Sequence, residues 1–397
     1  MSVFKSNVFT AFFFCNLLFL IFGQVIFQFL NFHFHIVGIT IPSIIFLVIY
    51  TIYFFILKFN SLKIKIYDFL FVGFLFYLII NYIFLGHTNN IDFFNRVILI
   101  ILFPYCVGRF FGSKVSVEAF QIFVIILSIS FLILIFEISQ NLALLNQDRF
   151  ILYDVKDDYG SGGSTQNFVS MIFGSAALIS FASRNFKKNL LLHNFIFLTS
   201  ICILVLFGSR SSTIAIILTV IITYLYIKKI NLFSLLKILF ILLIGFTIFI
   251  LFAPSSRQGF FNESIQGEGS TAIRGLLFFD AWNLFAKSPF FGIGASNFGH
   301  LYSLERADFA GPHSLFLHIL TELGIIGFLI FFLFVLFVIY SFKKKFKTKH
   351  TSVKKTLLPL FSLWIFLILD MQSYGNYFFD YQFFLFSGIL ISNIEKM

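Results

Sequence analysis

Long runs of apolar residues, each about the length of a membrane-spanning helix, follow one another along this 397-residue chain. An α-helix needs about 20 mostly apolar residues to cross a bilayer, and scanning for such stretches finds about twelve. The runs lie at 10–30, 36–57, 67–86, 92–112, 117–136, 168–183, 190–207, 211–228, 233–252, 313–341, 356–371 and 377–394. Because they are continuously apolar and do not alternate, they exclude the strands of a transmembrane barrel. The predicted fold class is an all-α polytopic membrane protein.

The composition supports this class and excludes most others. Hydrophobic residues make up 59% of the chain and charged residues only 11%, whereas roughly a quarter of an average soluble domain is charged. A water-soluble globule of this size needs a larger polar surface. Soluble enzymes, disordered proteins and secreted disulfide scaffolds are therefore excluded. Cys15, Cys106 and Cys202 lie inside apolar runs and are interpreted as buried apolar side chains.

The positive charges predict how the helices are oriented. The net charge is +11, and the lysines cluster between the apolar runs, as they do on cytoplasmic loops. Every second connection carries them, which places both termini in the cytoplasm. The predicted order is transmembrane helices 1–5 over 1–136, a periplasmic loop at 137–167, helices 6–9 over 168–252, a large periplasmic loop at 253–312 and helices 10–12 over 313–397.

The large outer loop contains a predicted amphipathic helix at 273–287, between the N-cap candidate Ser270 and the terminator Pro289. Its apolar stripe consists of Leu277, Phe278, Ala281, Trp282 and Phe285. Such a helix is expected to lie in the membrane interface, with Trp282 at headgroup level. Arg274 shares the stripe, where either an anionic substrate group or a lipid phosphate is a suitable partner. Both interpretations stay open.

A second arginine stands at an outer helix mouth, where the positive-inside rule does not require a cation. Arg210 lies in the sequence Gly208-Ser-Arg-Ser-Ser212, beside the predicted start of a helix. Free N–H groups at a helix N-terminus favour anions. We therefore favour an anion site at Ser209 and Arg210 over an interfacial anchor that contacts lipid headgroups.

The strongest local pattern is the segment 312–327. His313 stands at the outer mouth of the next helix, where an imidazole is available as a general base near neutral pH. Gly324 and Gly327 share its helical face and permit close approach of a neighbouring helix. A separate polar stripe consists of Ser314, His318, Thr321 and Glu322. Ionisable groups within a membrane are functional candidates, but an interhelical polar contact explains this histidine and glutamate equally well.

Other patterns predict no metal or nucleotide site. The acidic residues at 148–158 lack a coordinating pattern and are interpreted as part of a solvated connector. Gly292-Ile-Gly294 is a lone Gly-x-Gly outside any βαβ context. We expect neither a metal nor another cofactor.

Together these motifs resemble those of the O-antigen ligase and O-antigen polymerase superfamily of bacterial inner-membrane glycosyltransferases. That family carries a His followed by Asn or Ser, nine residues and Gly-x-x-Gly. It also carries a Ser-Arg pair at an outer helix mouth, and an Arg opening a helix that runs through Ala-Trp to a Pro and a Gly-x-Gly. The matching residues are Ser209-Arg210, then Arg274 with Ala281-Trp282, Pro289 and Gly292-Ile-Gly294, and then His313-Ser314 with Gly324-Ile-Ile-Gly327.

The resemblance implies a GT-C-like helical bundle that moves glycan from undecaprenyl diphosphate to a sugar hydroxyl at the periplasmic face of the inner membrane. It implies a metal-independent, inverting reaction. Arg210 and Arg274 then bind the diphosphate, and His313 takes the proton of the acceptor hydroxyl. Further substrate-binding candidates are Ser209, Ser314 and Trp282, with His318, Glu322 and Arg257 as secondary candidates.

The resemblance also implies the partners. They are the lipid-linked donor, a glycan or lipid A-core acceptor, the lipid bilayer and a chain-length regulator, but no nucleic acid. A polymerase of repeat units is favoured slightly over a ligase that joins the glycan to lipid A-core. A transporter of lipid-linked saccharide is the alternative of another class. Transporters usually show internal repeats and charges in the middle of the membrane. The transporter is disfavoured because this sequence shows no such repeat and few charges within its apolar runs.

Overall fold

A computed structural model describes much of the chain, and the fold is built from helices. The described residues are 35–36, 39–40, 45, 48–49, 64–86, 91–112, 164–183, 190–206, 210–227, 270–303, 311–312, 314–347, 351–374 and 381–396. The helices are α3 (Ile66–Leu85), α4 (Ile91–Arg96), the π-helix η2 (Val97–Leu102), α5 (Phe103–Phe111), α7 (Ser164–Ser183), α8 (Leu190–Leu206), α9 (Arg210–Ile227), α13 (Ser270–Lys287), α14 (Phe298–Ser303), α15 (Leu315–Phe346), α16 (Thr351–Tyr374) and α17 (Tyr381–Lys396).

The helices confirm most of the predicted apolar runs that fall on described residues. Helices cover nearly all described residues of the runs predicted at 67–86, 92–112, 168–183, 190–207, 211–228, 356–371 and 377–394, together with the loop helix predicted at 273–287. The predicted runs at 10–30, 117–136 and 233–252 lie outside the described residues.

The predicted helix at 36–57 is wrong at its beginning. Strand β1 (His35–Ile36) pairs there in antiparallel fashion with β2 (Ile39–Thr40). The β-branched residues in this stretch favour an extended backbone, and a glycine stands in the two-residue connection. A prediction that rests on the length of an apolar run takes neither feature into account.

Three helices of the described part are long and apolar enough to cross a membrane. They are Ile66–Leu85, Phe93–Phe110 and Leu315–Phe346. The shorter apolar helices Phe173–Ala182, Ser212–Tyr226 and Leu357–Gln372 accompany them. The structure therefore supports a helical membrane protein, as the composition predicts.

The second of these spans changes its helical pitch on the way. The π-helix η2 lies between α4 and α5, and the N–H of Phe103 donates to the carbonyl of Ile98. Pro104 follows directly. A proline has no N–H, and its ring clashes with the carbonyl four residues earlier in an α-helix. The wider π turns accommodate this residue without ending the span.

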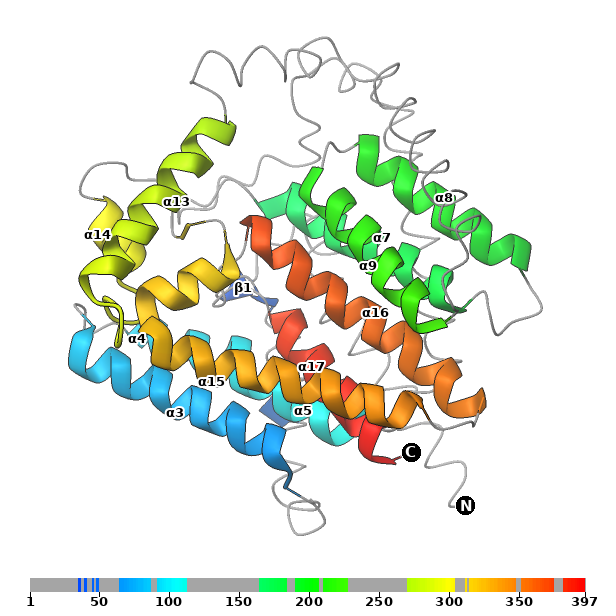
Figure 1. Cartoon of the computed structure of the whole chain (residues 1–397), viewed down its shortest axis with the longest axis horizontal. Helices are drawn as coiled ribbons and strands as arrows, with labels where there is room; N and C mark the ends of the chain where they lie inside the picture. Colours follow the sequence, from blue (N-terminus) through cyan, green and yellow to red (C-terminus); the bar gives the residue numbers. More distant parts are fainter. Residues whose placement is uncertain are drawn as a thin grey trace.

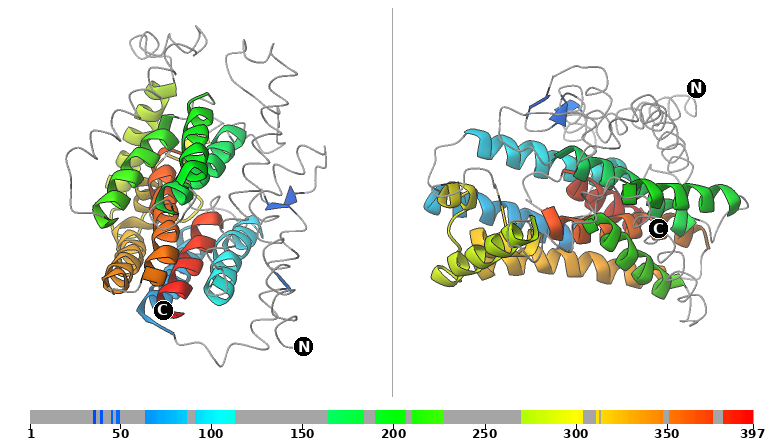
Figure 2. Two further views of the ribbon diagram at one scale, coloured as in Figure 1. Left: turned by 90° about the vertical axis from the view of Figure 1, so that its right-hand side faces the viewer. Right: turned by 90° about the horizontal axis from the view of Figure 1, so that it is seen from above.

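The centre of the bundle is formed by α16 and α17. Nearly every described side chain of α17, and those of α16 from Leu357 to Met371, are buried or nearly so. Figure 2 shows α17 between α16 and α5, and Figure 1 shows α7 and α9 on the other side of α16. Trp364 of α16 is fully buried, and its indole N–H donates to Ser387 of α17 at 2.7 Å. These two helices connect the two sides of the described bundle.

Glycines bring α5 and α17 into backbone contact. A Cβ added at Gly108 would lie 2.1 Å from the carbonyl oxygen of Leu385, and one added at Gly388 would lie 2.4 Å from that of Tyr105. Small residues at such crossings let helices in a membrane approach until their backbones touch. This contact fixes the second span against the last helix of the chain.

The helix α15 is not the single continuous span predicted at 313–341. Gly324 has φ 67° and ψ −171°, which interrupts the helix between a short part at 315–323 and a long part at 325–346. Figure 1 shows the two parts of α15 meeting at a sharp bend. The periodicity of apolar residues continues through this point, so the sequence gives no sign of the break except the glycine itself.

Candidate functional site

Two of the predicted catalytic residues lie near the N-terminal ends of helices. Arg210 is the first residue of α9, and Arg274 lies in the first turns of α13. The side chains of both arginines fall outside the described part of the chain, as do Ser209, Arg257 and His313. The helices α9, α13 and α15, which carry or follow the three predicted catalytic residues in the sequence, are described, and they show which helix ends are brought together.

The break in α15 is filled by the backbone of the loop that follows α13. The N–H groups of Ile293 and Gly294 donate to the carbonyls of Thr321 and Glu322, at 2.9 and 3.0 Å. In the other direction, Ile325 donates to the carbonyl of Pro289 at 2.8 Å. Interrupting a helix leaves backbone groups without partners, and buried groups of this kind need replacements. The loop supplies them.

Two glycines allow this crossing. A Cβ at Gly292 would lie 2.3 Å from the carbonyl oxygen of Glu322, and a Cβ at Gly324 would lie 2.3 Å from that of Phe290. Both glycines have positive φ, and the combination of φ and ψ at Gly324 is essentially restricted to glycine. The sequence interpretation assigned Gly324 to close helix packing. Its role is instead to break the helix and admit the loop.

The carboxylate of Glu322 holds the same loop. It accepts the N–H of Ser296 at 2.9 Å and that of Phe298, the first residue of α14, at 3.0 Å. The Nε2 atom of His318 lies 3.2 Å from the same carboxylate, and both side chains are 1% exposed. Of the two roles left open by the sequence, the polar contact is observed, and its partners are the loop residue Ser296 and the first residue of α14.

The short part of α15 is also fastened to α13. The hydroxyl of Thr321 donates to the carbonyl of Ala281 at 3.1 Å. A small apolar core lies beside this bond, made of Leu277, Ala281, Phe298 and Leu317 with Leu284 and Ile293 at its edge. The helix that carries Arg274 is therefore fixed against the helix that follows His313 in sequence.

The predicted apolar stripe of α13 is divided in the structure. Leu277 and Ala281 are buried against α15, and Phe285 is half-buried. Phe278 and Trp282 belong to the same predicted stripe but are exposed. Helical periodicity identifies a broad apolar arc, and only the packing partner decides which part of that arc is covered.

The C-terminal end of α16 connects the N-terminal ends of α9 and α15. Ser212, two residues after Arg210, donates to the buried carboxylate of Asp370 at 2.7 Å. Two residues after Asp370, the side-chain oxygen of Gln372 accepts hydrogen bonds from the N–H of Phe316 at 3.3 Å and from the hydroxyl of Ser314 at 3.4 Å. Gln372 thus caps α15 from a neighbouring helix.

This connection brings together the starts of α9 and α15. Ser212 follows Arg210 by two residues in the sequence, and Ser314 follows His313 directly. Both serines bond to the end of α16 that carries Asp370 and Gln372. A carboxylate beside the start of α9 is also favourable toward the positive end of the helix dipole. The sequence analysis missed Asp370, although an acidic residue inside the apolar run at 356–371 is a recognisable signal.

The middle of the chain matches a known family. Residues 195–332 match the family model described as O-antigen ligase. Through this segment, the chain is similar to the O-antigen ligase and O-antigen polymerase superfamily. No curated protein matches it. The match supports a function of the O-antigen ligase and polymerase type, in the synthesis of a surface polysaccharide.

The segment that matches the O-antigen ligase superfamily contains all three motifs. It begins within α8 and ends in the long part of α15. The break at Gly324, the crossing loop and Glu322 all fall inside it. Asp370 and Gln372 lie beyond its end, so α16 contributes to this site from outside the matched segment.

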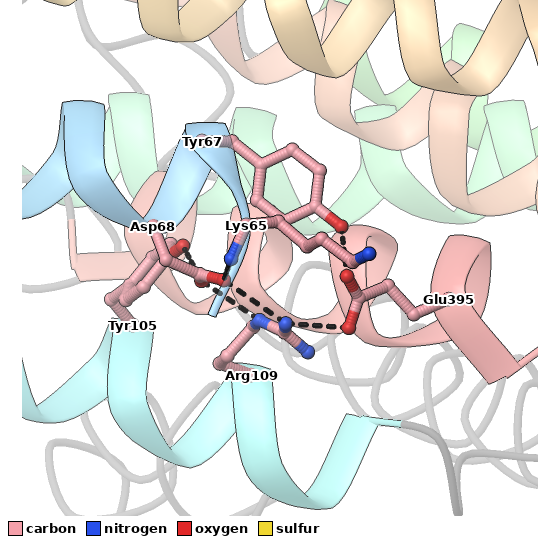
Figure 3. Close-up of polar contacts among 6 residues, drawn as sticks. All are labelled: Lys65, Tyr67, Asp68, Tyr105, Arg109 and Glu395. Carbon is pink, nitrogen blue, oxygen red and sulfur yellow. Dashed lines mark hydrogen bonds and ion pairs between the residues drawn. The ribbon is translucent and has the colours of Figure 1, made fainter. Parts of the chain in front are cut away.

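A second polar cluster lies at the opposite end of α3 from this site (Figure 3). Arg109 donates to both carboxylate oxygens of Asp68, at 2.9 and 3.1 Å, and to Glu395 at 2.6 Å. Tyr105 donates to Asp68 at 2.9 Å, and Tyr67 donates to Glu395. We call Tyr67, Asp68, Tyr105, Arg109 and Glu395 the ion cluster.

The ion cluster joins three parts of the chain that are far apart in sequence. Asp68 also accepts the N–H of Lys65 at 3.0 Å and so caps the start of α3. Arg109 is 5% exposed, and it comes from the end of the second span, while Glu395 comes from the end of α17. Sequence reasoning missed the cluster because each charge lies alone at the edge of an apolar run.

Proposed function

We propose that this protein transfers an undecaprenyl-diphosphate-linked glycan to a sugar hydroxyl at the periplasmic face of the bacterial inner membrane. In this proposal it acts as a repeat-unit polymerase for a surface polysaccharide. Arg210 and Arg274 bind the diphosphate and stabilise the charge that develops on it. His313 is the general base. Ser209, Ser314 and Trp282 contribute to substrate binding, and a chain-length regulator is a partner.

The observation that carries the proposal is the meeting of helix ends around α16. Ser212 and Ser314 bind Asp370 and Gln372, two residues apart on one helix end. In the sequence, Arg210 stands two residues before Ser212 and His313 directly precedes Ser314. A transferase needs the groups that bind the leaving group and the group that takes the proton around one reacting carbon, and this arrangement supports that requirement.

The attachment of α13 to α15 supports a place for the second arginine. Thr321, the crossing loop and the carboxylate of Glu322 hold α13 and the short part of α15 together. Arg274 belongs to α13, and His313 shortly precedes α15 in the sequence. The packing of these two helices against each other supports the proposal that both residues serve one site.

The proposed reaction is a direct displacement at the anomeric carbon. The oxygen of the acceptor hydroxyl forms a bond to C1 while the bond from C1 to the diphosphate oxygen breaks. The proton of the hydroxyl passes to His313, and the electron pair leaves with the diphosphate between the two arginines. A single displacement inverts the configuration at C1, and it needs no metal because guanidinium groups balance the charge.

Replacing His313 with Ala tests the assignment. General-base loss typically slows a reaction by about 10²–10⁴-fold, so a glycan gel should show almost no product. His350, in the lysine-rich connection after α15, offers a control, and His350→Ala should leave the product unchanged. Because the base must be neutral, activity of the parent should also fall on acidification through a pKa near 6.5, the ordinary value for histidine.

The same strain separates the polymerase from the ligase. If the protein is a polymerase, the His313→Ala strain should carry a single repeat on lipid A-core and lose the long ladder. The ligase is the second candidate, because the matching family model is described as O-antigen ligase. In that case the ladder should leave lipid A-core entirely and polymer should collect on the undecaprenyl carrier. Normal long-chain glycan would contradict both and favour a transporter.

A further inference from the structure

One face of α13 and the turn after it expose an unusual number of aromatic side chains. We call Phe278, Phe279, Trp282, Phe290 and Phe291 the aromatic surface; each is between 50% and 64% exposed. Phe278, Phe279 and Trp282 lie on the side of α13 that faces away from the small core around Leu277, and Phe290 and Phe291 follow in the turn. Large exposed apolar side chains gathered on one helix face and the turn beside it favour a contact with a membrane or with another macromolecule.

The aromatic surface begins where the lipid-facing side of a membrane span ends. Asn81 of α3 donates to the carbonyl of Phe291 at 2.7 Å, and Asn297 donates to the carbonyl of Leu85 at 2.8 Å. These bonds place the turn directly on the last residues of α3, a helix with the length and composition of a span. The same end of α3 exposes Ile83 and Phe84.

The direction of α13 fits a position along a membrane surface. Figure 1 shows α13 (yellow-green) at the end of α3 and of the long part of α15, lying across these helices and not along them. A helix that crosses the ends of spans lies near the plane of the interface. Trp282 is of the type that collects at the headgroup level, and Lys287 at the end of α13 is exposed and able to reach lipid phosphate.

We propose that the aromatic surface is inserted into the lipid leaflet that the C-terminal end of α3 reaches. The occupant of this surface is the bilayer itself, at the depth of the headgroups and the first part of the acyl chains. The sequence predicts an interfacial helix, but the predicted stripe includes Leu277 and Ala281, which pack on protein. The structure assigns the lipid contact to a different set, which adds Phe279 and the turn residues Phe290 and Phe291.

The insertion would also bring α13 to the depth at which a lipid-linked donor carries its diphosphate. A lipid-linked donor moves within the leaflet and carries its diphosphate at headgroup depth. A helix fixed at that depth by aromatic side chains meets such a ligand without drawing it out of the membrane. The proposal stands on the exposed residues and the contact with α3, and it does not require the transferase activity.

The two tryptophans of the chain make a direct test possible. Trp282 is exposed and Trp364 is fully buried, so a Trp364→Phe variant reports the surroundings of Trp282 alone. The full-length protein is reconstituted in phosphatidylcholine vesicles with or without bromine near the top of the acyl chains. We expect brominated lipid to remove most of the Trp282 emission, and acrylamide in the water to remove little.

A matched variant gives the background emission of the buried tryptophan. Trp282→Phe retains only Trp364, whose emission should respond weakly to either quencher. If Trp364→Phe does not fold, subtracting the Trp282→Phe signal from that of the unchanged protein gives the contribution of Trp282 without altering the core. Phe279→Asp should reduce the quenching of Trp282 by brominated lipid, whereas Phe279→Leu should preserve it.

Two outcomes overturn the proposal. Strong quenching of Trp282 by acrylamide but not by bromine places the aromatic surface in water. Protection from both quenchers places it against protein, either a second copy of the chain or another partner. Neither outcome bears on glycan transfer, and loss of transfer in the His313→Ala strain does not bear on quenching, so the two proposals fail separately.

Discussion

Glu322 shows how a buried charge in a membrane protein is used for structure close to a candidate site. Its carboxylate satisfies two backbone N–H groups at the start of α14 and lies beside His318. A carboxylate that accepts backbone N–H groups forms stronger hydrogen bonds than a neutral acceptor. The residue therefore anchors the loop that crosses α15, and its effect on chemistry passes through that loop.

Substitutions at Glu322 should separate this role from a direct catalytic one. Glu322→Ala leaves the buried N–H of Phe298 without an acceptor, which costs about 1–3 kcal/mol, and should lower the thermal unfolding midpoint in detergent. Glu322→Gln keeps one acceptor oxygen and should recover much of the midpoint and of the glycan product. A catalytic acid or base would lose its product equally with Gln. Thr321→Ser retains the neighbouring hydroxyl and serves as the control.

At the scale of elements, the decisive feature is the interruption of α15. A 32-residue helix would place the segment after His313 in line with the membrane span. The break at Gly324 instead turns the short part toward α13 and opens a gap in the helical hydrogen bonds that the crossing loop fills. One backbone conformation thus joins the loop, α13 and α15 into one unit.

Alanine at two glycines should have opposite effects. Gly324→Ala forces a side chain into a backbone region that costs about 1–3 kcal/mol and directs a Cβ against the carbonyl of Phe290. Thermal unfolding should occur at lower temperature, and glycan product should fall. Gly275, in α13, has open space around its Cβ position, and Gly275→Ala in a helix should stabilise by about 0.5–1 kcal/mol. Equal stability of both variants would show that the loop after α13 does not cross α15 at Gly324.

At the scale of the whole described bundle, polar groups join separate helices at both ends. The ion cluster joins the start of α3, the end of α5 and the end of α17. The contacts around Asp370, Gln372 and the crossing loop join helix ends on the side where α3 finishes. Between them lie the apolar contacts of α16 and α17. Apolar side chains alone fix the helices weakly in a lipid environment, so the polar contacts at the ends specify which helices are neighbours.

Removing the cation of the ion cluster should destabilise the bundle strongly. Removing one partner of a buried ion pair lowers the free energy of unfolding by roughly 3–5 kcal/mol. We expect the lower part of this range because Glu395 is 20% exposed. Arg109→Leu should therefore lower the thermal midpoint in detergent. Adding Asp68→Asn and Glu395→Gln removes the unpaired charges and should restore part of the loss. Failure of the triple variant to recover would show that packing, and not charge, is responsible.

The orientation of the bundle can be measured with fusions. The lysine pattern predicts that the region after Lys345 is cytoplasmic and the region around Glu268 is periplasmic. A reporter that is active only in the cytoplasm should be active when fused after Lys345 and silent when fused near Glu268. The reverse result at either site would refute the twelve-helix arrangement.

Much of the helical organisation followed from the sequence because it depends on local composition. A run of about 20 apolar residues is helical wherever it meets lipid, since no other spanning structure satisfies its own backbone. The loop helix, which spans Ser270–Lys287, was predicted for a similar reason. The residues that indicate its start and its end, Ser270 and Pro289, stand at its two ends in the sequence. The order of motifs from Arg210 to Gly327 likewise needs no structure to be recognised.

Tertiary structure alone decided how these elements meet. Gly324 breaks its helix only because the loop after Pro289 supplies the missing hydrogen bonds, and Asp370 matters only because the end of α16 lies beside the start of α9. Which side of α13 is buried depends likewise on α15 and not on the periodicity of α13 itself. The sequence determines what each segment favours through its own backbone and side chains. Contacts between residues far apart along the chain depend on packing, and packing is a property of the folded molecule.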